Sequence, residues 1–95
     1  MKNKYESIII ISGKLIEEDY KKSLESIIER IKSFIEIEKI EEIGKKKLAY
    51  EVKENKEGWY VVFYFNAQSQ AISELERIYR ITDDVIKFMT IRIGD

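Results

Sequence analysis

The fold is decided by residues 36–65, which read EIEKIEEIGKKKLAYEVKENKEGWYVVFYF. Apolar residues recur at intervals of two along residues 36–53, which predicts one long strand that is interrupted at Gly44. A glycine inside such a pattern is typical of a bulge or bend, because glycine alone takes positive φ without steric cost. The polar residues 54–58 predict a hairpin connection, and the aromatic run 59–65 predicts the returning strand. The centre of the chain is therefore predicted to be an antiparallel pair of strands.

The segments on either side of this hairpin also have clear periods. Residues 4–11 end in four consecutive isoleucines and predict a strand, because β-branched side chains fit a pleated sheet. Apolar residues at spacings of three and four predict a helix over residues 17–35. A second, shorter helix is expected to begin within residues 66–69 and to end near Arg80. Residues 85–93 then predict a closing strand.

The order β-α-β-β-α-β indicates the fold class α+β, in the ferredoxin-like arrangement. We expect a four-stranded antiparallel sheet with both helices packed on one face. The 95 residues, 44% of them apolar, are enough for a single domain over residues 1–95 and for its core.

Alternation along the strands predicts an apolar surface on the sheet face that the helices leave open. In residues 59–65, Trp59 and Phe63 lie on one side while Tyr60 and Tyr64 lie on the other, and both sides are apolar. Two helices cover only one side. An exposed apolar patch of this size is typical of an interaction surface. The predicted partner-protein surface consists of Ile8, Ile10, Tyr60, Val62, Tyr64, Met89 and Ile91.

Composition excludes most catalytic chemistry. The chain has no Cys and no His, so it lacks thiolate nucleophiles, imidazole bases and every Cys/His zinc pattern. The residues therefore support no named catalytic residue, metal ligand or cofactor, and a ferredoxin-like phosphatase that uses Arg and Asn alone is the enzyme that they leave open. The apolar runs are far shorter than the roughly 20 residues of a membrane span, which predicts a cytoplasmic protein without a membrane partner.

Charge is balanced overall but uneven along the chain. The 17 Lys and Arg against 18 Asp and Glu leave a net charge of −1. The acidic segment 36–42 is followed at once by Lys45, Lys46 and Lys47, so the sign reverses across Gly44. Such an edge can contact a phosphate backbone, although a solvated charged hairpin is the simpler alternative from composition alone.

The aromatic strand does not match a general reader of single-stranded RNA. Domains of that kind share this element order and carry a basic residue and a small residue in their aromatic motif. Here Glu57 stands at the basic position, and Tyr60 stands where a small residue leaves room for a base. Core packing accounts for the remaining aromatic residues.

An ordered set of short motifs resembles the bacterial small-subunit (30S) ribosomal protein S-six (S6) family. Each motif is weak alone, but together they span nearly the whole chain in the expected order. They are Lys4-Tyr5-Glu6, Glu41-Glu42-Ile43-Gly44, Lys46-Lys47-Leu48-Ala49-Tyr50, Gly58-Trp59-Tyr60, Glu74-Leu75-Glu76-Arg77 and Asp84-Val85-Ile86-Lys87-Phe88-Met89.

The resemblance implies a structural constituent of the 30S subunit, located on the cytoplasmic ribosome, with no enzymatic activity and no small-molecule substrate. It would bind the central domain of 16S rRNA cooperatively with ribosomal protein S-eighteen (S18). Carried over by position, the implied rRNA-binding residues are Lys2, Lys4, Tyr5, Lys46, Lys47, Tyr50, Lys87 and Arg92. The alternative that the residues leave open is a ferredoxin-like module that dimerises, or senses a small ligand, through the open sheet face.

Overall fold

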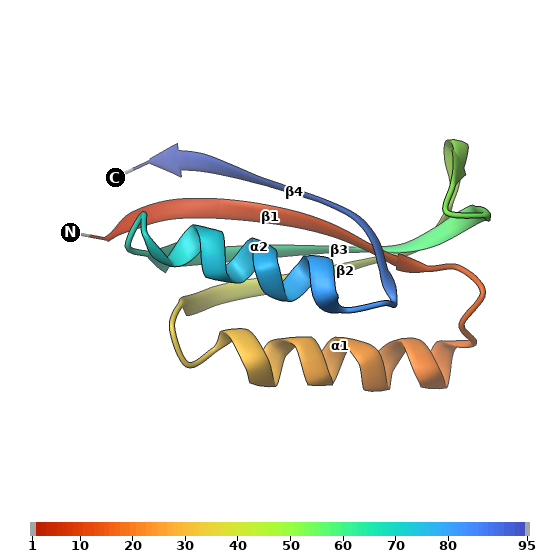
Figure 1. The fold of residues 1–95 in the computed structure, drawn as a ribbon, viewed down its shortest axis with the longest axis horizontal. Helices are drawn as coiled ribbons and strands as arrows, with labels where there is room; N and C mark the ends of the chain where they lie inside the picture. Colours follow the sequence, from red (N-terminus) through yellow and green to blue (C-terminus); the bar gives the residue numbers. More distant parts are fainter. Residues whose placement is uncertain (1, 95) are drawn as a thin grey trace.

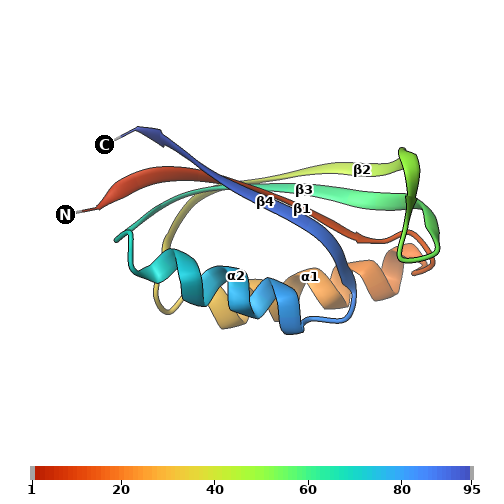
Figure 2. The same cartoon turned by 45° about the horizontal axis from the view of Figure 1, so that its top comes forward.

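The predicted element order is confirmed in the computed structural model, which describes residues 2–94 (Figure 1). The strands and helices are β1 (Asn3–Ser12), α1 (Glu17–Ile31), β2 (Glu36–Val52), β3 (Asn55–Ala67), α2 (Ala71–Ile81) and β4 (Val85–Gly94). The sheet order is β2-β3-β1-β4, and every neighbouring pair is antiparallel. Figure 2 shows both helices on the same side of the sheet. The ferredoxin-like fold class is therefore confirmed.

The main core lies between the sheet and the two helices. Ile9 and Ile11 of β1 and Phe63 of β3 point to this side, as their shared parity in the register requires. They pack against one stripe of each helix, formed by Tyr20, Leu24, Ile27 and Ile31 of α1 and Leu75, Ile78 and Tyr79 of α2. Near the N-terminal end of α1, the Tyr20 ring stacks on that of Trp59, with ring centres 4.4 Å apart.

The first helix ends earlier than predicted, at Ile31 instead of residue 35. The amide of Phe34 donates to the carbonyl of Ile31, which turns the chain so that β2 can begin at Glu36. Ile35 is nevertheless buried, and it enters the core from this turn. The helical spacing of apolar residues therefore extends to residue 35 in the sequence, because Ile35 is a core residue although it lies in the turn. Similarly, residues 66 and 67 extend β3, so the second helix begins only at Ala71.

The hairpin connection is shorter than the predicted residues 54–58. Lys53 and Glu54 alone make the turn, with φ of 46° and 64°, and Val52 pairs with Asn55. Two consecutive positive φ values match the twist of a hairpin, but Asn-Gly is the usual sequence for them. Here the buried Asn55 stabilises the turn, since its Nδ2 donates to the carbonyls of Val52 and Lys53 at 3.3 and 3.0 Å.

The predicted irregularity at Gly44 is confirmed, and a larger one follows it. Gly44 has φ of 110°, and the β2–β3 register shifts between Glu42 and Gly44. Further on, Lys47 pairs with Glu57 and Val52 pairs with Asn55, so residues 48–51 face a single residue of β3. Bulges of this kind bend a strand and re-aim its side chains. We call residues 48–54 the hairpin tip, and Figure 1 shows it standing off the sheet on the side opposite to the helices.

Neither helix within residues 2–94 is long and apolar enough to cross a membrane.

Candidate nucleic-acid interface

Three consecutive lysines lead from the bulge at Gly44 into the hairpin tip. Lys45 lies opposite Trp59, and its ammonium is 5.5 Å from the indole ring. Lys46 lies opposite Gly58, which has no side chain to cover it, and Lys47 lies opposite Glu57. A side chain at position 58 would displace Ile10, because an added Cβ would be 2.3 Å from Cγ2 of Ile10. Within residues 2–94, no carboxylate lies within ion-pair distance of Lys46 or Lys47, and both side chains are exposed.

A small second core holds the hairpin tip in place. Leu48 is only 8% exposed and packs with Ile10 of β1 and Ile86 of β4, while Val52 and Tyr60 border the contact. We call these five residues the tip cluster. From the other side, Ser12 Oγ donates to Oδ1 of Asn55 at 2.7 Å. The tip is therefore anchored to both β1 and β4 and is not a free loop.

The tip brings together two predicted residues that are far apart in the sequence. Tyr50 is 65% exposed, and Nζ of Lys87 in β4 donates to its hydroxyl at 3.0 Å. This hydrogen bond and the charge of Lys87 lower the pKa of Tyr50, and the same contact raises the pKa of Lys87. Lys46, Lys47, Tyr50 and Lys87 thus form one group at the hairpin end of the sheet, which we call the tip group.

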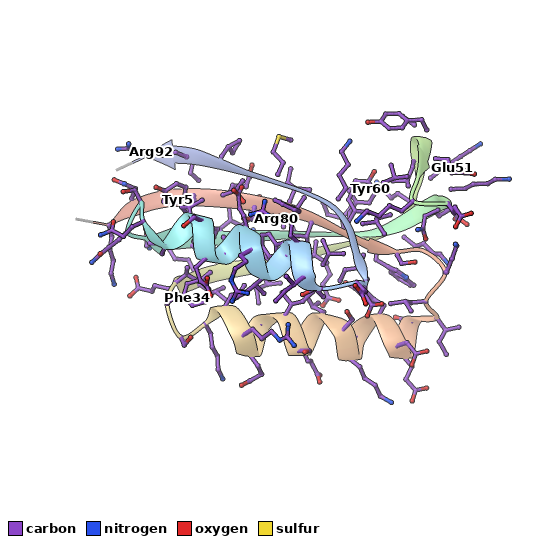
Figure 3. All side chains as sticks on the ribbon, viewed as in Figure 1. Tyr5, Phe34, Glu51, Tyr60, Arg80 and Arg92 are labelled. Atoms are coloured by element: carbon purple, nitrogen blue, oxygen red, sulfur yellow. The ribbon has the colours of Figure 1, made fainter. Side chains whose placement is uncertain are left out.

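The other predicted cations lie at the opposite end of the sheet, near the chain termini (Figures 1 and 3). Lys2 forms an exposed ion pair with Glu36 at 3.5 Å, and Nη2 of Arg92 donates to Oδ1 of Asn3 at 3.2 Å. Lys4, which follows Asn3 in the chain, is also exposed. The molecule is 39 Å along its longest axis, so these residues and the tip group make two separate basic regions.

The ring of Tyr5 lies in the core, and only its hydroxyl reaches the terminal basic region, where Nδ2 of Asn3 donates to it at 3.5 Å. Tyr5 shares parity with Ile9 and Ile11, so its ring faces the helices, where it is 6% exposed and stacked on Phe65 at 5.6 Å. The ring is therefore unavailable for stacking on a base, and its contribution is to the core. The alternation of side chains along β1 puts Tyr5 on the same face as Ile9 and Ile11, so this pattern could have predicted its burial.

The seven residues of the predicted partner-protein surface all lie on the open sheet face, but they differ in exposure. Ile10 and Val62 are already buried at 7% and 5%, and the tip cluster accounts for Ile10. Met89 and Ile91 on the edge strand β4 are 57% and 45% exposed. Ile8, Tyr60 and Tyr64 are partly buried, and Tyr60 packs in the tip cluster.

Sequence reasoning missed two kinds of residue here. Ile93 continues the exposed series on β4 at 52% exposed, and simple alternation from Met89 could have found it. The residues that position the tip, Leu48 with Ile86 and Asn55 with Ser12, gave no such signal, because each pair is distant in the sequence. No group of three or more potential metal-ligating side chains occurs in the described part of the chain.

Comparison with known proteins decides the family. A statistical model of the family described as Ribosomal protein S6 matches residues 4–92, which include both basic regions except Lys2. This chain belongs to the ribosomal protein S6 family. The resemblance inferred from the ordered motifs is thereby confirmed.

Individual relatives of the S6 family agree with this assignment. The chain is 42% identical to small ribosomal subunit protein bS6 of Thermotoga petrophila, with 96% of this chain and 73% of the relative covered. It is also 42% identical to the bS6 protein of Caldanaerobacter subterraneus subsp. tengcongensis, with 96% and 97% covered. The crystal structure of 30S ribosomal protein S6 from Thermotoga maritima matches with a TM-score of 0.85 at 38% identity, covering 98% of this chain and 89% of that one.

Proposed function

We propose that this chain is a structural component of the 30S ribosomal subunit that binds the central domain of 16S rRNA together with ribosomal protein S18. Membership of the S6 family carries the proposal. The tip group supports it, because Lys46, Lys47 and Lys87 stand exposed with no carboxylate among the described residues to neutralise them. The proposal gives the protein no catalytic role.

Electrostatics explains why the protein needs a partner on the RNA. With a net charge of −1 the molecule as a whole does not attract a polyanion, so binding depends on local contacts. The tip group supplies three cations, and Lys2, Lys4 and Arg92 supply three more at the other end. The exposed Lys2–Glu36 pair contributes at most about 1 kcal/mol, so a phosphate can replace the carboxylate at little cost. Few phosphate contacts give modest affinity, which a second bound protein raises.

S18 is proposed to dock on the open sheet face. The exposed side chains there are Met89 and Ile91 on β4, beside the partly buried Ile8 and Tyr64. The buried Ile10 and Val62 support this surface from below and do not contact the partner directly. An apolar patch at an unpaired sheet edge favours a protein partner over an RNA backbone.

The test is a salt-controlled binding titration with a central-domain 16S rRNA fragment, with and without S18. We compare the wild type with Lys46→Ala/Lys47→Ala. If both lysines contact phosphate, the slope of log K against log salt falls by about 1.8, and affinity in about 0.1 M salt falls roughly 50-fold. Binding of the wild type is expected to be tight only in the presence of S18.

A matched control is Lys22→Ala/Lys32→Ala, with Lys22 on α1 and Lys32 directly after its last residue. It removes the same charge from two exposed lysines that are paired with helix carboxylates, Glu18 at 3.9 Å and Glu29 at 2.8 Å. Both lie on the helix layer, away from the tip group, so this variant should keep the wild-type salt slope. Equal losses for the two double variants would mean that only net charge matters. No binding by the wild type, with or without S18, would refute the proposed function.

The second candidate is a module that dimerises, or binds a small ligand, through the same open face. The exposure of Met89 and Ile91 favours it, since nothing within residues 2–94 covers them. Sedimentation equilibrium of the isolated protein tests the dimer. A concentration-dependent dimer that Met89→Lys abolishes, together with absent rRNA binding, would establish this alternative.

A further inference from the structure

The β2 bulge aims Tyr50 outward in a way that packing does not explain. Regular alternation would place Leu48, Tyr50 and Val52 on one side of the strand, but the bulge interrupts it. Leu48 and Val52 enter the tip cluster, whereas Tyr50 between them is 65% exposed. An aromatic ring left in water forgoes the stabilisation of about 1.5–3 kcal/mol that full burial of a large apolar side chain gives. Its position is nevertheless held by two anchored neighbours in the chain.

Lys87 contacts the ring of Tyr50 at its hydroxyl end. Nζ of Lys87 is 3.0 Å from the Tyr50 hydroxyl oxygen but 5.1 Å from the ring centre. Because Nζ is much farther from the ring centre than from the hydroxyl oxygen, it lies beyond the hydroxyl and not above the centre of the ring. The contact orients the phenol, and the Tyr50 side chain remains 65% exposed. A flat ring of fixed direction beside cations is the arrangement with which proteins stack unpaired nucleobases.

We propose that Tyr50 is a stacking platform for one unpaired nucleobase, with Lys87 as the residue that positions the ring and with Lys46 and Lys47 beside it on the flanking phosphates. This inference rests on the proposed rRNA-binding function and extends it. It differs from a phosphate-only tip, because stacking adds affinity that does not depend on salt, whereas each phosphate contact adds to the salt slope.

The experiment compares Tyr50→Leu, Tyr50→Phe and Lys87→Met in the titration with the central-domain fragment and S18. Tyr50→Leu should weaken binding about 10-fold, within the range for loss of one stacked base, while its salt slope stays at the wild-type value. Tyr50→Phe keeps the two ring faces but loses the hydroxyl that Lys87 holds, so it should weaken binding less than Tyr50→Leu and still bind less tightly than wild type. Lys87→Met should weaken binding, and restoring the cation as Lys87→Arg should recover most of it.

Phe34→Leu is the matched control, since it makes the comparable aromatic-to-leucine change in the turn between α1 and β2, which Figure 3 shows at the other end of the molecule from the tip. Ultraviolet cross-linking of the complex supplies an independent readout. A nucleotide attached to the peptide that contains Tyr50, and absent with Tyr50→Leu, is the expected result.

The outcomes separate this inference from the proposed function. If the wild type binds and Lys46→Ala/Lys47→Ala lowers the salt slope, but Tyr50→Leu binds like wild type, the stacking platform is refuted and the function stands. If Tyr50→Leu weakens binding of S18 in the absence of RNA, Tyr50 is a protein contact and the inference is also refuted. If the wild type does not bind, the proposed function fails first.

Discussion

Replacing Tyr79 by Phe is expected to stabilise the protein. Tyr79 is fully buried in α2, and its hydroxyl makes no hydrogen bond within the described residues. Ser7 lies near it, but the Ser7 hydroxyl already shares a 2.8 Å hydrogen bond with Thr90. A buried polar group without a partner costs about 1–3 kcal/mol, and Phe removes it while keeping the ring against Phe88 at 5.4 Å.

We place the gain at the lower end, about 1 kcal/mol, because the nearby Ser7 oxygen compensates part of the cost. For a domain of this size that corresponds to a rise in Tm of about 4–8 °C. The assay is urea unfolding followed by Trp59 fluorescence, with thermal unfolding by circular dichroism beside it. Tyr64→Phe, at a partly exposed site, serves as the control and should change stability by less than about 0.5 kcal/mol. A Tyr79→Phe protein that is less stable than wild type by about 1 kcal/mol would show that the hydroxyl is bonded, and would refute the reasoning.

Two further predictions concern the tip and the alkaline range. Leu48→Ala should lower the free energy of unfolding by about 2 kcal/mol, which is the low end for a buried leucine because the tip cluster is small. Hydrogen exchange should become faster at the tip amides but not in α1. Unchanged exchange at the tip would contradict the anchoring role of Leu48. Burial raises the pKa of Tyr79, and burial together with Glu42 raises that of Tyr20, from the ordinary value of 10.0. The neutral phenols are therefore tolerated below pH 10, and stability falls above it, by up to about 1.4 kcal/mol per pH unit for Tyr79 and by less for Tyr20, whose hydroxyl bonds to the exposed Glu42. Urea midpoints measured above pH 10 should fall less steeply for Tyr79→Phe, and equal slopes would argue against a buried, neutral Tyr79.

Local periodicity was enough to predict most of the fold. The stripe that contains Tyr20 and Leu24, the aromatic alternation around Phe63 and the bulge at Gly44 all appear where expected. These features are local because helix and strand periods follow from backbone geometry alone. The same patterns misplaced the end of α1, since the buried Ile35 has the spacing of a helical residue but lies in a turn.

The turn at Lys53 and Glu54 could not be predicted from its own residues. Neither is a usual residue for positive φ, and the conformation is held by Asn55, which in turn is bonded to Ser12 in β1. A prediction from neighbouring residues cannot include a partner that is 43 positions away.

The sequence by itself determined the element order, the two-sided apolar sheet and the family. Each of these depends on patterns of residues that are close together in the chain, so the linear sequence contains them. Only the tertiary structure decided which of the predicted residues act together. It buried Tyr5 in the core, divided the cations between two ends of the sheet, and brought Lys87 to Tyr50 across 37 positions. The physical reason is strand register. β1 pairs with both β3 and β4, and the bulge in β2 places the tip against residues of β1 and β4.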